Sequence, residues 1–291
     1  MYIYKVFGLM IQSELELPEL IEAEGQTEIM IRIGKVPAFL QQPIIKTPWY
    51  EVEKDRFLHK VNGVASYYVE NGTSITIEPE NNASEELIRL FLLNSVLAPL
   101  LLQKGYLILQ GSAVVINGKA VAMLGGTAMG KTSFALALHE RGQQLITDGI
   151  CAIKLVNSKL MIYQGIPQMN IWRDTLQAFN KNIGDYREVR QGLEKYVFDI
   201  KPCIAEDAVE LAGIVVIRSY NANDILCEKI KGAKKIEELK THSNYWDMVT
   251  DKAKLFQIQI AAGKLPMLRL SYNRFLKQLD KIAEVIEKEG M

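Results

Sequence analysis

The chain has little cysteine and no excess of either charge, and each shortage excludes a class of protein. Its 291 residues include three cysteines, Cys151, Cys203 and Cys227, and no CxxC pair. We therefore expect neither a disulfide framework nor a cysteine-based zinc site, and a reducing cytoplasm fits best. Lys plus Arg and Asp plus Glu both number 34, which excludes the broad basic surface of a dedicated nucleic-acid binder.

Long apolar runs and targeting signals are also scarce. The N-terminus has no basic segment followed by an apolar one, so no signal peptide is predicted. The most apolar stretch, residues 87–102, is interrupted by Arg89, Asn94 and Ser95 and is shorter than the ~20 residues that cross a bilayer. We interpret it as a buried helix and expect no membrane partner.

The remaining composition is that of a globular protein with a full core, since 48% of the residues are hydrophobic and 23% are charged. At about 150 residues per domain, the length suggests two domains. We predict a strand-rich region with a long helix over residues 1–104, for substrate recognition or packing. A second, chemically active domain is predicted over 105–291.

Local patterns predict the elements of the first region. The alternation IMIRI at 29–33 is typical of a strand. Asn71-Gly72 between two apolar runs predicts a hairpin, because both turn residues need a positive φ. NNASEE, from residue 81, offers helix N-caps, and the apolar run then continues to Gln103, with Gly105 beyond its end. Pro99 is expected to kink this helix.

The second half has a denser strand signal. Asn117-Gly118 predicts a hairpin whose return strand, 120–124, is wholly apolar. A helix is expected at 131–141, ended by Gly142, and then a short strand at 145–147 that stops at Asp148. Further strands are predicted at 151–156, 213–217 and 267–272. An amphipathic helix is predicted over 273–289, with Phe275, Leu279, Ile282 and Ile286 on one face.

Residues 125–132, GGTAMGKT, match the phosphate-loop pattern GxxxxGK[ST]. Glycines allow backbone N–H groups to wrap around a phosphate, and the following helix offers its N-terminus to the same anion. Lys131 can reach the outer phosphates and the Thr132 hydroxyl can ligate Mg²⁺. We therefore predict binding of ATP (or GTP) with Mg²⁺. The predicted binding residues are Gly125, Gly126, Thr127, Ala128, Met129, Gly130, Lys131, Thr132 and Ser133.

Asp148 is the second landmark, because an acid after a short strand beside such a loop can hold Mg²⁺ or accept a proton. A turn residue is the alternative interpretation, since Asp also favours turns. We predict Lys131 and Asp148 as catalytic residues, and Thr132 and Asp148 as metal ligands.

The stretch 111–155 resembles the catalytic domain of HPr kinase/phosphorylase. The whole chain resembles the HPr-kinase-like serine kinases of peptide-modification gene clusters, such as those for lasso peptides. The N-terminal start, the helix before GSAV, YQGIPQMNIW (163–172) and RQGLEKY (190–196) contribute to this resemblance. It implies an α/β (α+β) P-loop kinase core of the type shared with phosphoenolpyruvate carboxykinase, in a mainly antiparallel sheet, and a serine-bearing peptide or protein as substrate.

Two positions depart from that family pattern. Gln110 stands where the family usually has His, and Gly149 stands where it has the second acid of an Asp-Asp pair. Gln exchanges no proton and Gly offers no side-chain oxygen, so the family's full acid–base and metal set does not carry over. The leading hypothesis is a serine kinase that acts on a ribosomal-peptide precursor. The alternatives are a nucleotide-binding regulatory protein without turnover and a kinase or nucleotidyl transferase for a small molecule. A homo-oligomer is left open.

Other residues carry weaker signals. Arg173, Arg190 and Lys195 fall in the resembling segments and are read equally well as phosphate ligands or exposed charges. The three histidines have no metal-ligand spacing. The tryptophans Trp49, Trp172 and Trp246 are interpreted as packing residues.

Overall fold

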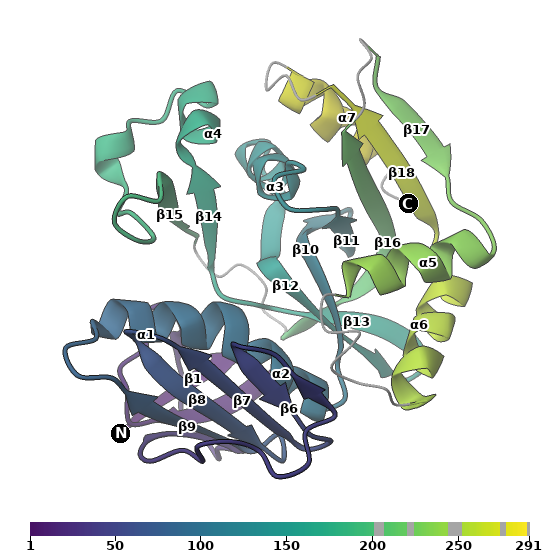
Figure 1. Ribbon diagram of the computed structural model, residues 1–291. Coiled ribbons are helices and arrows are strands. Elements are labelled where there is room, and N and C mark those ends of the chain that lie inside the picture. Colours follow the sequence, from purple (N-terminus) through teal and green to yellow (C-terminus); the bar gives the residue numbers. More distant parts are fainter. Residues whose placement is uncertain (201–206, 220–223, 244–251, 274–277, 290–291) are drawn as a thin grey trace. The chain divides into compact units, whose positions relative to one another are not determined.

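A computed structural model describes residues 1–200, 207–219, 224–243, 252–273 and 278–289 of the chain. The described residues form two compact units. The first comprises Met1–Ile108 and residues 252–254, and the second comprises the rest from Leu109 on. The architecture is a mixed α/β fold, with a strand-rich N-terminal sheet and a second, mixed sheet (Figure 1).

The first unit is built on a nine-stranded sheet in the order β3-β1-β2-β4-β9-β8-β7-β6-β5. Its strands are β1 (Tyr2–Val6), β2 (Leu9–Ser13), β3 (Ile21–Glu22), β4 (Ile29–Ile33), β5 (Ile45–Lys46), β6 (Tyr50–Val52), β7 (Arg56–Val61), β8 (Ala65–Glu70) and β9 (Ser74–Pro79). β4 runs parallel to both of its neighbours, β2 and β9, whereas the other pairings are antiparallel.

The predicted hairpin of this unit is confirmed. β8 and β9 pair from Glu70↔Ser74 outward, and Asn71 and Gly72 have φ of 55° and 63°. The alternation of buried and partly exposed residues along β8 places one face of the hairpin in the core. The Asn71-Gly72 turn is what made this segment recognisable in the sequence.

The predicted long helix is interrupted. It consists of α1 (Glu85–Phe91), the π-helical turn η1 (Leu92–Val96) and α2 (Leu97–Gln103), and Ser84 caps its start. Pro99 has no N–H to offer the carbonyl four residues earlier, and the π-helical turn lies just before it, in the part of the helix where a kink was predicted. Gly105 follows the helix with φ +80°, as predicted. The Tyr67 hydroxyl donates to the Ile88 carbonyl at 3.0 Å and ties α1 to β8.

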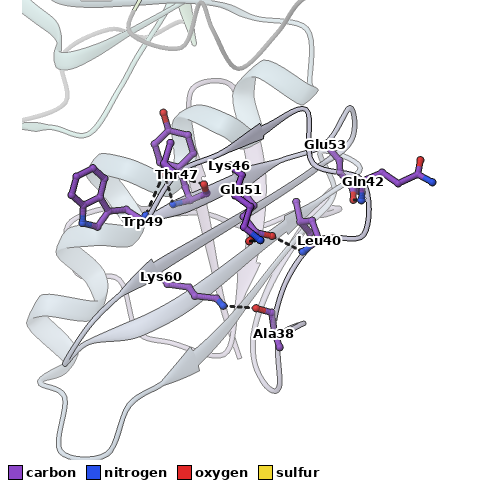
Figure 2. A network of polar contacts seen from close by, with 10 residues as sticks. Ala38, Leu40, Gln42, Lys46, Thr47, Trp49, Glu51, Glu53 and Lys60 are labelled. Carbon is purple, nitrogen blue, oxygen red and sulfur yellow. Dashed lines mark hydrogen bonds and ion pairs between the residues drawn. The ribbon is translucent and has the colours of Figure 1, made fainter.

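Trp49 is exposed, so its interpretation as a packing residue is wrong. Figure 2 shows it on a tight turn between β5 and β6. The Tyr50 N–H donates to the Thr47 hydroxyl at 2.9 Å, and the indole is 66% exposed. Nearby, the Glu51 carboxylate accepts from the Leu40 N–H at 2.6 Å, and this bond lowers the Glu51 pKa. Trp246 lies outside the described residues.

The second unit contains a seven-stranded mixed sheet in the order β11-β10-β12-β13-β16-β18-β17, with β11 also paired to β16. Its strands are β10 (Leu107–Ile116), β11 (Lys119–Leu124), β12 (Gln144–Val156), β13 (Lys159–Tyr163), β16 (Ala208–Ser219), β17 (Leu226–Lys229) and β18 (Met267–Tyr272). The pairings β11–β10–β12–β13–β16–β11 form a closed ring. β16 runs parallel to β11 and β18. A separate two-stranded sheet joins β14 (Gln168–Trp172) to β15 (Lys195–Asp199).

Helices cover both faces of the mixed sheet. α3 (Lys131–Glu140) and α7 (Leu279–Glu289) share an apolar core with Val215 and Ile217 of β16. Successive side chains of a strand point to opposite faces, so Arg218 lies on the other face, where it contacts α5 (Ala233–His242). α4 (Arg173–Ala178), the short 3₁₀ helix η2 (Ile183–Asp185) and α6 (Lys252–Lys264) complete the fold (Figure 1). In the described ranges, no helix combines the length and apolar character that crossing a bilayer requires.

Several predictions for this unit are confirmed. The Asn117-Gly118 hairpin joins β10 to β11, with Ile116 opposite Lys119. β18 has the predicted bounds, and the turn residue Gly142 follows α3 with φ +92°. In α7 the buried residues include Leu279, Ile282 and Ile286, as the amphipathic pattern predicted. Phe275, the fourth residue of that pattern, lies outside the described residues.

Candidate functional site

The phosphate-loop sequence lies between a buried strand and a helix. Residues 120–124 of β11 are all buried, and α3 begins at Lys131. Gly130 forms the N-cap of α3 with φ +86°, and Ala128 also has a positive φ of 60°. Such values turn the chain sharply, so residues 125–130 make a compact bend that ends at a helix N-terminus.

Two glycines of this bend have little space for a side chain. A Cβ at Gly125 would lie 3.0 Å from the Ile217 carbonyl oxygen, and one at Gly130 would lie 2.7 Å from the Tyr272 hydroxyl. The Tyr272 hydroxyl also donates to the Met129 carbonyl at 3.2 Å. The bend is therefore fixed against the ends of β16 and β18, and a larger side chain at either glycine would displace it.

Lys131 turns back over the bend. Its ammonium donates to the carbonyls of Gly125 at 3.0 Å and Gly126 at 2.9 Å. Burial lowers the Lys131 pKa, and the Asp148 carboxylate acts in the opposite direction. The cation is thus held at the bend, where a phosphate group would need it.

Asp148 does not end a strand, so that prediction is wrong. β12 runs without a break from Gln144 to Val156 and replaces the two strands predicted there. Gly149 takes φ +98° within it, and the Thr147 hydroxyl donates to the Ile150 carbonyl at 2.7 Å. The glycine lets the strand deform locally and continue, and Asp148 projects from this deformation.

Hydroxyl groups from two elements converge on the Asp148 carboxylate. Ser112 of β10 donates to Oδ1 at 2.5 Å, and Thr132 of α3 lies 2.9 Å from Oδ1 and 3.1 Å from Oδ2. Burial raises the Asp148 pKa, against the lowering effect of these two hydrogen bonds and of the Lys195 charge. The structure therefore brings together Asp148 and Thr132, which the sequence predicted as metal ligands.

Ser112 was missed as a site residue by sequence reasoning. It is fully buried and lies between Gly111 and the apolar end of β10. A Cβ at Gly111 would lie 2.6 Å from the Met123 carbonyl oxygen, so β10 and β11 approach closely here. A polar residue inside an apolar strand needs a partner. That was the available signal, although it could not identify Asp148.

The two-stranded sheet supplies further polar groups. The positive charge of Lys195 and a hydrogen bond with the Asn170 backbone both lower the pKa of Asp148. The Lys195 charge also lowers the pKa of Lys131. The Lys195 ammonium lies 5.5 Å from the centre of the Trp172 ring. Trp172 is 43% exposed, which corrects its interpretation as a packing residue.

The remaining candidate residues differ in the contacts that they make. The Ser133 hydroxyl lies 3.0 Å from that of Thr175, on α4. Arg173 donates to the Tyr196 hydroxyl at 2.9 Å and pairs with Glu194, whereas Arg190 is exposed. Of the three cations named from the sequence, Lys195 has the clearest link to Asp148.

The oxygen donors at Asp148 suit Mg²⁺, a hard cation that prefers carboxylate and hydroxyl oxygen and usually keeps waters and substrate phosphates as further ligands. Thr132 and Asp148 already lie together. Within the described part of the chain, no group of three His, Cys, Asp or Glu side chains forms a site for a metal held by protein alone. The arrangement fits an ion shared between these two residues and a nucleotide.

Comparisons with known proteins add one structural similarity. No protein-family model matches the chain, and neither does any curated protein. Among solved structures, the chain is similar to the HPr(Ser) kinase/phosphatase from Coxiella burnetii. The match covers 63% of this chain and 95% of that one, with 12% identity and a TM-score of 0.34.

Proposed function

We propose that the chain is an ATP- and Mg²⁺-dependent serine kinase acting on a peptide or protein hydroxyl. The phosphate-loop sequence at residues 125–132 supports ATP binding, because it connects a buried strand to a helix N-terminus. Lys131, the lysine of this loop, supplies the positive charge that outer phosphates need.

The observation that carries the proposal is the contact between Thr132 and Asp148. Phosphoryl transfer depends mainly on positioning and on neutralising phosphate charge, so a loop hydroxyl and an acid at one point suffice for its core. In this proposal Thr132 and Asp148 hold Mg²⁺, which when bound neutralises phosphate charge. Lys131 binds phosphate oxygens, and Asp148 accepts the proton of the acceptor hydroxyl through its second oxygen.

A second candidate function is nucleotide binding without turnover. Two positions favour it, since Gln110 and Gly149 provide neither a proton-exchanging ring nor a second acid. Phosphoryl transfer would require Asp148 to act both as metal ligand and as base. A protein that keeps the loop but loses transfer would serve as a nucleotide-dependent regulator.

ATP binding is tested by thermal unfolding with and without ATP–Mg²⁺. At about 100 times the Kd, bound ATP should stabilise the parent protein by ~2.7 kcal/mol. Lys131→Ala should unfold normally without ligand and gain little from ATP. Lys234→Ala, which changes an exposed lysine of α5, is the matched control and should respond like the parent. A parent protein without any shift would refute both candidate functions.

Transfer is tested with ATP labelled at the γ-phosphate and a serine-containing peptide library. A matched library with Ala at every Ser position is the control. Label in the serine library alone supports the kinase. ATP binding without label in either library, together with an unchanged free ATP pool, supports the regulatory alternative.

A further inference from the structure

A buried carboxylate holds two arginines on the face of the mixed sheet opposite α3. Glu238 of α5 is 6% exposed and accepts from Arg218 at 2.7 Å and from Arg269 at 2.9 Å. A buried charge is costly unless it is paired, so the Glu238 carboxylate should hold both guanidinium groups in place. The proposed function assigns it no role.

The cluster lies at the sheet edge that carries the phosphate-loop bend. β11, β16 and β18 are parallel neighbours, so their carboxyl ends meet at one edge, where ligands of such sheets bind. Leu124 pairs with Val216, and the bend starts at Gly125 beside Ile217. Arg218 is the next residue of β16.

The phosphate-loop bend contacts the residue before Arg218 and the strand partner of the residue after it. The first contact is the approach of Gly125 to Ile217, and the second is the hydrogen bond from Tyr272 of β18 to the Met129 carbonyl. In the register of β16 and β18, Tyr272 pairs with Ser219, the residue after Arg218. The backbone of Arg218 is therefore adjacent to the loop.

The Arg218 side chain retains donors for a ligand. It is 41% exposed, and its hydrogen bond to Glu238 uses one terminal nitrogen, Nη2. A guanidinium has five N–H donors in a planar fork, and phosphate oxygens match that fork. Burial lowers the His242 pKa to about 4, and the charges of Arg218 and Lys131 contribute to this decrease, whereas Glu238 opposes it. Arg218 and Lys131 are therefore both near enough to His242 to influence its charge.

We propose that Arg218, held in place by Glu238, is a phosphate-binding residue of the nucleotide site, in addition to Lys131. This inference rests on the proposed nucleotide binding. Glu238 acts as a positioning residue, since it contacts the guanidinium and not the ligand. Arg269 is the natural comparison, because it binds the same carboxylate but pairs with Val216, two residues further from the sheet edge.

The test compares Arg218→Gln with Arg269→Gln by calorimetric titration of the full chain with ATP, ADP and AMP in Mg²⁺. A hydrogen bond to a charged group contributes about 1.5–3 kcal/mol, so Arg218→Gln should raise the ATP Kd about tenfold to a hundredfold. The rise should be smaller for AMP, which lacks the outer phosphates. Arg269→Gln should lower the melting temperature and leave the ATP Kd close to that of the parent.

Arg218→Lys provides the second variant if the Gln variant does not fold. It keeps the charge without the fork, so it should bind ATP more tightly than Arg218→Gln and more weakly than the parent. Equal ATP Kd values for the parent and Arg218→Gln would overturn the inference while leaving nucleotide binding intact. An equal loss in the Arg218 and Arg269 variants would also overturn it, by indicating a structural cluster. A parent that binds no ATP would refute both.

Discussion

Replacing Asp148 with Asn separates the chemical role of this residue from its structural role. The change keeps the shape of the side chain and removes its charge. Ser112 and Thr132 donate to the carboxylate, and their hydroxyls can rotate to accept from an amide instead. We therefore expect the variant to fold.

The two expected effects of Asp148→Asn have opposite signs. Loss of a general base or metal ligand should lower the rate of phosphoryl transfer about 10²–10⁴-fold. Folding should become more favourable at neutral pH, because burial raises the Asp148 pKa above its unfolded value. The folded parent then binds more protons than the unfolded chain. Its stability therefore falls as pH rises through the interval between those two pKa values, and the neutral variant escapes this loss.

The assay combines initial rates, ATP titration and thermal unfolding without ligand between pH 4 and 8. ATP affinity should change much less than rate, because Lys131 and the helix N-terminus remain. Asp55→Asn is the control, since Asp55 is exposed and belongs to the first unit. The reasoning is refuted if the variant transfers phosphate at the parent rate. A variant less stable than the parent throughout the pH range would contradict the electrostatic part.

Three further predictions concern Gly130, Gly149 and Gln110. Gly130→Ala should abolish ATP-dependent stabilisation, because its Cβ would meet the Tyr272 hydroxyl at 2.7 Å and its φ is +86°. Calorimetry would check this against Gly142→Ala, which has a similar φ but no close neighbour and should cost only about 1–2 kcal/mol of stability. Gly149→Asp introduces the second acid of the Asp-Asp pair in the resembled kinases but places a side chain at φ +98°, so we expect a lower melting temperature. Gln110→His introduces no backbone strain of this kind, so it tests more directly whether Gln110 lowers the rate of phosphoryl transfer. Unchanged turnover in this variant would indicate that Gln110 does not limit that rate.

Local signals in the sequence account for much of the fold. Asn-Gly turns, the helix-ending glycines and the apolar faces of β8 and α7 each depend on neighbours along the chain, and all were predictable. The parallel position of β4 between β2 and β9 was not, because it depends on contacts between distant segments. β12 was divided wrongly since Gly149 imitates a turn in the sequence while it permits a deformation within a strand.

The candidate site also combines local features, which the sequence predicts, with distant contacts, which it does not. The loop residues were predictable because they form a contiguous motif. The roles of Ser112 and Arg218 were not predictable. The partner of Ser112, Asp148, lies 36 residues away along the chain, and the partner of Arg218, Glu238, lies 20 residues away. Periodicity indicates that a residue lies on a strand, but it does not indicate which distant residue lies opposite.

The closed ring of strands has a consequence for where the molecule can open. β11 has hydrogen-bonded partners on both edges, so its amides have no free edge from which fraying can begin. The sheet of β14 and β15, which carries Trp172 and Lys195, is a single ladder of five residue pairs. Local opening starts where few cooperative bonds must break, so we expect hydrogen exchange to be slower in β11, beneath the phosphate-loop bend, than at this ladder. The phosphate-loop bend thus follows a strand without a free edge, while Lys195 belongs to a ladder that can open separately.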